Sequence, residues 1–235
     1  MKTAPAGYLH ALRELLEANA DPRKALKMKK YMRNQFEFFG ISSPVRKALL
    51  RGFIKDHGFP NAEELELVCK ELYSQPEREF HYFAMEMVKR NIKKFNESSV
   101  KLFEYMIVSH SWWDTVDFIA ANILGKYFRI YPAIIRDVTK NWMDSGNIWL
   151  QRSCILFQLK YKKQTDTGLL YIFIGQLKTS NEFFIQKAIG WILREYSKVN
   201  PDEVLLFADR NALKPLSRRE ALRILKKKGY STLAF

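Results

Sequence analysis

The chain contains the sequence VKLFEYMIVSHSWWDTVDFI at residues 100–119. Val100, Phe103 and Ile107 are spaced i, i+3 and i+7, so they form one apolar stripe on a helix. After a break at Ser111, a second helical pattern follows. Two short helices of this kind cannot bury both of their faces alone, so the stretch predicts a unit that must stack against others.

The same apolar pattern recurs with a spacing of 35 residues. In the first helix of each repeat, the equivalent triplets are Leu65, Val68, Leu72; Val100, Phe103, Ile107; Ile135, Val138, Trp142; Leu170, Phe173, Leu177; and Leu205, Ala208, Ala212. In the second helix, the equivalent pairs are Phe80, Ala84; Thr115, Ile119; Leu150, Cys154; and Ile185, Ile189. A repeat of a two-helix unit predicts an α-solenoid.

We therefore predict an all-α fold: a right-handed α-solenoid of HEAT-like two-helix repeats with a concave basic face. The period is close to the ~34 residues of tetratricopeptide repeats, but the W-x₂-L-G-x₂-Y signature of that class is absent. The expected domain is single, residues 1–235. In it, residues 1–57 form an atypical N-terminal helical cap and residues 61–228 form about five repeats of period 35.

Local signals mark where helices begin. Asp21-Pro22 combines an N-cap acid with Pro at the first helical position, and Ser43-Pro44 and Asn200-Pro201 repeat that pattern. Ser217-Arg-Arg-Glu220 matches a capping box. The expected helices are 5–19, 22–34, 43–57, 61–74, 76–92, 97–109, 111–128, 131–144, 147–163, 167–179, 182–198, 201–211 and 217–228. Residues 36–41 (FEFFGI) are expected to be the turn that packs the cap onto the array.

Composition narrows the function. The net charge of +14 on 235 residues favours a polyanionic partner, nucleic acid first and an anionic membrane surface second. No apolar run is long enough to span a bilayer, and the N-terminus lacks a signal sequence, so we expect a cytoplasmic protein. Cys69 and Cys154 fall on apolar helix faces, and the histidines share no ligand spacing, so we expect no metal and no cofactor.

One helix face is not explained by the core. With Thr115 at 0° and about 100° per residue, Ile119 falls on the core side, whereas Trp113 and Asp117 fall at about 160° and 200°. The Asp117 position is occupied in neighbouring repeats by Tyr82, Arg152 and Lys187, and Trp191 follows Lys187 by four residues. The pattern predicts that a carboxylate, two cations and two indoles meet on one surface.

Structural explanations exist for the same residues. Trp113 and Trp191 could instead be large aromatic residues buried at the junction between two repeats. Asp117 could instead form an ordinary structural ion pair with Arg152. Trp112 and Trp142 map to core faces and Trp149 to an edge, so these three are assigned to the structure. On the residues alone, the surface predicts nucleic-acid binding more directly than it predicts chemistry.

Several longer segments resemble the AlkD-type DNA alkylation repair glycosylases, which are built from HEAT-like repeats. These segments are 31–32 (YM), 38–44 (FFGISSP), 72–80 (LYSQPEREF), 111–117 (SWWDTVD), 147–152 (NIWLQR), 155–161 (ILFQLKY) and 182–196 (EFFIQKAIGWILREY). The resemblance covers nearly the whole chain. It implies a monofunctional glycosylase that excises N3- or N7-alkylated purines from duplex DNA and leaves an abasic site, without extruding the lesion into a pocket.

The resemblance also implies roles for individual residues. Its catalytic carboxylate falls on Asp117, its two catalytic tryptophans on Trp113 and Trp191, and its active-site arginine and tyrosine on Arg152 and Tyr31. Tyr31 lies outside the repeat and rests on the resemblance alone. Candidates for binding DNA phosphates are Ser42, Ser43, Lys47, Arg152, Lys160, Lys187 and Arg194.

Two other functions stay open at this stage. A non-catalytic HEAT-like scaffold would bind nucleic acid electrostatically, and a protein-binding scaffold would show little salt-sensitive DNA binding. For the enzyme, the expected partner is double-stranded DNA containing alkylated bases, no membrane is involved, and a capped solenoid is expected to act as a monomer. The residues do not rank the alkylpurine lesions.

Overall fold

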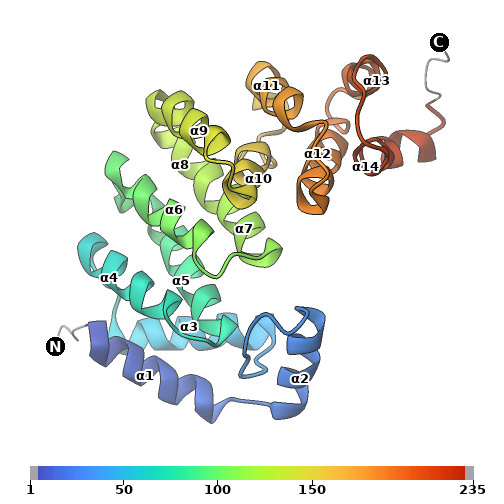
Figure 1. Cartoon of the computed structure of the whole chain (residues 1–235). Coiled ribbons are helices and arrows are strands. Elements are labelled where there is room, and N and C mark those ends of the chain that lie inside the picture. The colour runs from blue at the N-terminus through green and yellow to red at the C-terminus, as the bar shows by residue number, and fades with distance from the viewer. Residues whose placement is uncertain (1–4, 231–235) are drawn as a thin grey trace. The chain divides into compact units, whose positions relative to one another are not determined.

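The structure, a computed structural model, describes residues 5–230. The regular elements in this range are helices (Figure 1), so the all-α prediction is confirmed. Residue contacts divide the chain into unit 1, residues 1–110, and unit 2, residues 111–235. Residues 1–4 and 231–235 of the expected single domain lie outside the described residues, and its continuity, handedness and concave face stay predictions.

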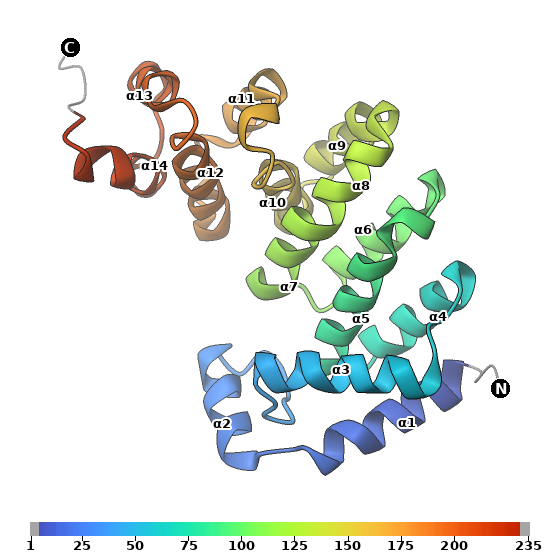
Figure 2. The ribbon, with the colours of Figure 1, turned by 180° about the vertical axis from the view of Figure 1, so that it is seen from behind.

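Unit 1 contains α1 (Pro5–Ala18), α2 (Pro22–Tyr31), α3 (Ser43–His57), α4 (Ala62–Tyr73), α5 (Arg78–Asn91) and α6 (Val100–Val108). α4 packs against α5, α1 and α6, and α3 packs against α1 and α5 (Figure 2). The repeat residues Leu65 and Leu72 of α4 and Phe80 and Ala84 of α5 are fully buried. The apolar register therefore identifies the faces along which these helices pack.

The turn at residues 36–41 is fixed by a buried carboxylate. Glu79 of α5 accepts backbone N–H groups from Phe39, Gly40 and Ile41 at 3.1, 2.9 and 3.1 Å. Burial raises the pKa of Glu79, and these N–H donors oppose the rise. Gly40 has φ +89°, and a Cβ there would lie 2.1 Å from the Asp21 carbonyl oxygen, so glycine is required. The predicted docking of this turn is confirmed.

The helix starts were predicted with mixed success. Asp21 and Asn200 are N-caps whose side chains accept backbone N–H groups, as expected. At α3 the N-cap is Ser42 rather than Ser43, and no side-chain cap bond forms. The capping box at Ser217 is wrong, because α14 begins at Pro215 and the Ser217 hydroxyl donates to the Gln186 carbonyl oxygen instead. The Ser217 hydroxyl, which the local pattern assigned to a helix cap, therefore makes a tertiary hydrogen bond to another helix.

Unit 2 contains α7 (Trp113–Phe118), α8 (Gly125–Ile130), α9 (Ile135–Asp144), α10 (Ile148–Leu156), α11 (Thr167–Leu177), α12 (Phe183–Tyr196), α13 (Pro201–Arg210) and α14 (Pro215–Lys227). α10 packs against α7, α9, α11 and α12, and α12 packs most extensively against α14 (Figures 1 and 2). Thr115, Ile119, Ile185 and Ile189 are completely buried, as the repeat predicts.

Two helices of unit 2 differ from their predicted form. α7 and α8 are joined by a π-helical segment, Ile119–Leu124, so the predicted helix 111–128 is widened in its middle. The predicted helix 147–163 is too long, because α10 ends at Leu156. Two residues later, the buried Gln158 side-chain amide donates to the Asp166 carbonyl oxygen at 3.1 Å and accepts from the Asp166 N–H at 2.7 Å. These bonds stabilise a loop where the sequence predicted that the helix continues.

Most of the predicted core positions are buried, but the last repeat is wrong at Ala212, which is exposed because α13 ends at Arg210. Val100, Ile135, Val138 and Leu205 are only half-buried. Cys69 and Cys154 are buried free thiols, and Trp142 is buried. Trp112 is half-buried, with its ring against Trp149 and Phe184. Within residues 5–230, no helix combines the length and the apolar character that crossing a bilayer needs.

Candidate active site

A cavity of about 340 Å³ opens on unit 2 where α7, α10, α12 and α14 meet. Its lining residues are Trp113 and Asp117 of α7, Arg152 of α10, Phe183, Phe184, Lys187, Trp191 and Arg194 of α12, and Glu220 of α14. We call it the acid–aromatic pocket. It brings together six of the residues that the sequence singled out, and all of its lining side chains are carried by helices.

Asp117 and Arg152 form the polar floor of the acid–aromatic pocket. Arg152 donates from Nε to Asp117 Oδ1 at 2.7 Å and from Nη2 to Oδ2 at 2.8 Å, a bidentate ion pair. Arg152 Nη1 donates to the Phe184 carbonyl oxygen. The side chains of Arg152 and Asp117 are only 4% and 14% exposed. The ordinary ion pair that the sequence left open is therefore present, and it lies on the wall of the cavity.

The electrostatic state of Asp117 follows from two opposing influences. Burial raises the pKa of Asp117 above its usual 3.8, and the Arg152 guanidinium lowers it by charge and by hydrogen bonding. The negative charge of Asp114, on the same helix, raises this pKa by a smaller amount. A desolvated carboxylate held by one guanidinium keeps a fixed orientation and interacts strongly with any positive charge that enters the pocket.

Aromatic rings form the remaining walls. Trp113 and Trp191 are half-buried and line the pocket, so neither is sealed inside a repeat junction. Phe183 is 55% exposed, although it begins a helix that is otherwise well packed. Phe184 lies edge-on to Trp112, with ring centroids 5.2 Å apart, and 4.9 Å from the Trp149 centroid. These contacts hold the N-terminus of α12, whose Phe184 carbonyl oxygen accepts from Arg152.

The α14 side of the acid–aromatic pocket is occupied by an ion cluster. Glu220 accepts from Lys187 Nζ at 3.1 Å and from Arg194 Nη1, and Arg223 Nη1 lies 3.8 Å from Glu220 Oε2. Burial is the largest single influence on Glu220 and would raise its pKa, but Lys187 and Arg194 together bring the pKa below its usual value. Two predicted phosphate contacts, Lys187 and Arg194, are therefore already paired.

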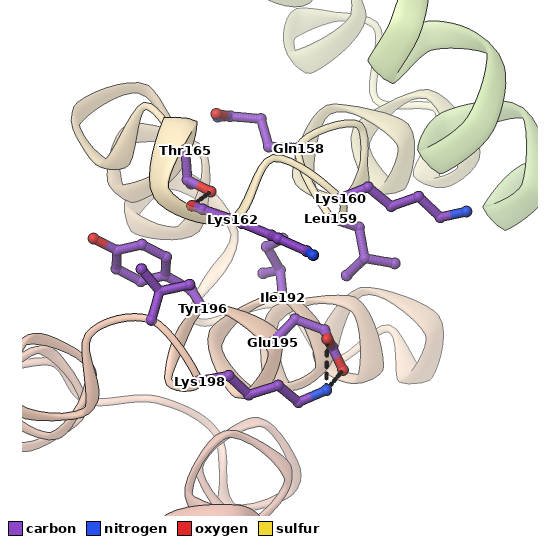
Figure 3. A pocket seen from close by; sticks show the side chains of 10 residues that line it. Gln158, Leu159, Lys160, Lys162, Thr165, Ile192, Glu195, Tyr196 and Lys198 are labelled. Carbon is purple, nitrogen blue, oxygen red and sulfur yellow. Dashed lines mark hydrogen bonds and ion pairs between the residues drawn. The ribbon is translucent and has the colours of Figure 1, made fainter.

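Lys160 lies in a different part of unit 2. It is exposed, and its Nζ donates to Asn122 Oδ1 at 2.6 Å. It lines two adjoining cavities of about 510 and 580 Å³ at the α10–α11 loop and the C-terminus of α12. In Figure 3 the Lys162 side chain extends into the space between that loop and α12, and Lys198 is bonded to Glu195. This region is basic and accessible but does not include Asp117.

The other predicted site residues lie in unit 1. Tyr31 ends α2 and is 69% exposed. At the N-terminus of α3, Ser42 is half-buried and Ser43 and Lys47 are exposed. These side chains are accessible to a ligand, and their assigned roles stay predictions.

Similarity to known proteins identifies the family of this chain. The family model described as DNA alkylation repair enzyme matches residues 12–225. The chain belongs to the DNA alkylation repair enzyme family. No curated protein matches it. Among solved structures, it is similar to one described as a predicted DNA alkylation repair enzyme from Enterococcus faecalis, with 34% identity and a TM-score of 0.82 over 88% of this chain and 97% of that one. The helical-repeat fold is shared with that structure.

Three residues that line the acid–aromatic pocket of this DNA alkylation repair enzyme were not predicted as site residues from the sequence: Phe183, Phe184 and Glu220. Phe183 and Phe184 stand within the segment that carries the family resemblance, and the proximity of aromatic residues to Lys187 was an available signal. The sequence assigned Glu220 to a capping box with Ser217, which the structure does not contain, and its spacing of 33 residues from Lys187 departs from the 35-residue repeat. Only the packing of α14 on α12 places it at the site.

Proposed function

We propose that this DNA alkylation repair enzyme is a monofunctional alkylpurine DNA glycosylase, acting as a monomer on duplex DNA. It hydrolyses the N-glycosidic bond of N3- and N7-alkylated purines and leaves an abasic site. The observation that carries the proposal is the desolvated Asp117 carboxylate, fixed by Arg152 and facing an aromatic cavity. An ion pair with only a structural role has no need of that exposed aromatic surface.

The chemistry requires little beyond that carboxylate. An N3- or N7-alkylpurine is already cationic, so it leaves the sugar without a general acid. As the bond breaks, the deoxyribose acquires oxocarbenium character, which a nearby negative charge stabilises. Asp117 supplies the charge and can orient or deprotonate the attacking water, whose oxygen forms the new bond to C1′. Arg152 keeps the carboxylate in place.

The aromatic rings contribute in a complementary way. Indole faces attract cations and polarised C–H groups, by about 0.5–2 kcal/mol each depending on solvent access. Trp113 and Trp191 are half-exposed in the pocket and can contact the sugar and the cationic base. The described residues that line the pocket all belong to helices, and none of them comes from a loop that could enclose an extruded base. This arrangement supports excision without extrusion of the lesion.

The decisive experiment measures release of 7-methylguanine from methylated duplex DNA under single-turnover conditions. We expect release by the wild type and a loss of about 10²–10³-fold in Asp117→Asn, the scale typical of removing one electrostatic stabiliser. Asp114→Asn is the matched control, because it removes the same charge from the same helix but does not line the pocket; we expect its rate to stay close to that of the wild type.

The competing functions give different outcomes in the same experiment. No release by the wild type, together with salt-sensitive DNA binding, would identify a non-catalytic nucleic-acid scaffold. Undiminished release by Asp117→Asn would show that another group performs the chemistry. Absence of salt-sensitive DNA binding would point to a protein scaffold.

A further inference from the structure

Glu220 is held in place by backbone packing rather than by flexible side chains alone. A Cβ on Gly190 of α12 would lie 2.5 Å from Glu220 Cβ and 3.0 Å from the Ser217 carbonyl oxygen. The absence of a side chain at Gly190 thus lets α14 approach α12 closely. The Ser217 hydroxyl, one turn before Glu220, donates to the Gln186 carbonyl oxygen at 3.0 Å and ties the two helices together. The carboxylate is therefore built into this wall of the acid–aromatic pocket.

The two α12 cations that Glu220 contacts lie on either side of Trp191 along the helix. Lys187 and Arg194 are seven residues apart on α12, about two turns, so they lie on one face with Trp191 between them. One Glu220 oxygen accepts from Lys187 and the other from Arg194. A DNA phosphate also presents two unesterified oxygens to cations. Glu220 thus makes with these two side chains the contacts that a phosphate would make.

We propose, building on the DNA binding in the proposed function, that Glu220 is a specificity-determining residue. It takes the place of a DNA phosphate between Lys187 and Arg194 and so weakens the binding of undamaged DNA. Phosphates are common to damaged and undamaged duplexes, whereas contacts of a cationic base with the pocket are not. Reducing the phosphate contribution therefore increases the share of the binding energy that depends on the lesion.

The test is the salt dependence of binding to an undamaged duplex. In Glu220→Gln, Lys187 and Arg194 become available to phosphate, so we expect tighter binding and a log–log salt slope that is steeper by about 0.9 for each phosphate gained. For one phosphate, this adds about a 3.5-fold loss of affinity between about 50 and 200 mM salt. Equal or weaker binding with an unchanged slope would overturn the proposal.

A control separates this effect from a general gain of positive charge. Asp144→Asn also removes one acid from an ion pair in unit 2, with Lys140 at 2.8 Å, but neither residue lines the acid–aromatic pocket. We expect a smaller gain in affinity for Asp144→Asn, with little change in slope. Equal effects of the two variants would overturn a specific role for Glu220. Thermal unfolding of each variant confirms that the folded proteins are compared.

Lys187→Ala tests the same claim without altering Glu220. If Glu220 already pairs with Lys187 in the wild type, Lys187→Ala alone leaves the salt slope unchanged. In the Glu220→Gln background, the same substitution lowers the slope. A slope lowered by about 0.9 in Lys187→Ala alone would show that Lys187 contacts phosphate despite Glu220, which contradicts the proposal. Undamaged DNA needs no excision, so these results are independent of glycosylase activity. Absence of any DNA binding would overturn both proposals.

Discussion

Replacing Arg152 with Met removes the group that holds Asp117 and keeps a side chain of similar length in the buried space. Three hydrogen bonds are lost: two to the Asp117 carboxylate and one to the Phe184 carbonyl oxygen. Asp117 remains almost buried but without its counter-ion. The variant therefore tests whether the pair, rather than the carboxylate alone, produces the properties of the acid–aromatic pocket.

The expected cost is large because both partners are desolvated. Removing one member of a buried ion pair costs about 3–5 kcal/mol. For a chain of this size each kcal/mol lowers Tm by about 2–4 °C, so Arg152→Met should melt about 6–20 °C below the wild type. At neutral pH we expect excision to fall by about 10²–10³-fold, because the unpaired carboxylate loses its orientation and takes up a proton more readily.

The pH dependence has a defined sign. In the wild type, burial raises the pKa of Asp117 and Arg152 opposes the rise, so the carboxylate is lost as the pH falls through a value above 3.8. Without Arg152 the pKa rises further, and the acid limb of the excision rate moves to higher pH. A raised folded-state pKa favours the folded state at low pH. The stability deficit of Arg152→Met should therefore shrink as the pH is lowered.

Single-turnover excision against pH and thermal unfolding provide the measurements. Arg152→Lys keeps a charge but only one donor group, so it should fall between the wild type and Arg152→Met. The double variant Asp117→Asn with Arg152→Met removes both charges and should be more stable than Arg152→Met alone. An unshifted acid limb, or a double variant less stable than Arg152→Met, would refute the reasoning.

The remaining predictions concern other contacts in unit 2. Gly190→Ala should lower the free energy of unfolding by about 1–3 kcal/mol because its Cβ meets α14, whereas Gly175→Ala on α11, with no atom within 4 Å, should raise it by about 0.5–1 kcal/mol; chemical denaturation measures both. Trp191→Ala should lower kcat/KM for excision by about 2–30-fold with little loss of stability, since the ring is half-exposed and contributes about 0.5–2 kcal/mol, and steady-state kinetics would show it. Lys160→Ala should reduce the salt slope of DNA binding by about 0.9, because its exposed Nζ donates to the neutral Asn122 and so keeps its charge available to a phosphate; an unchanged slope would remove Lys160 from the interface.

The amino-acid sequence was sufficient to predict the fold class and the helix face that lines the candidate site. Because the apolar positions repeat every 35 residues, most of the buried set could be predicted without coordinates, and Thr115 and Ile189 are fully buried. The prediction is weaker where a helix ends early, since Ala212 lies beyond α13 and is exposed. The same count left Trp113 and Asp117 without a place in the core. Periodicity is a local property of each helix, so it can be obtained from the chain alone.

The tertiary structure decided which groups meet that face and what state they are in. It paired Asp117 with Arg152 at 2.7 and 2.8 Å, widened α7 and α8 with a π-helical segment, and ended α10 at Leu156. It also placed Glu220 between Lys187 and Arg194, through a helix whose start departs from the repeat. These features depend on desolvation and on close helix–helix approach, which arise only when segments far apart in the chain pack together.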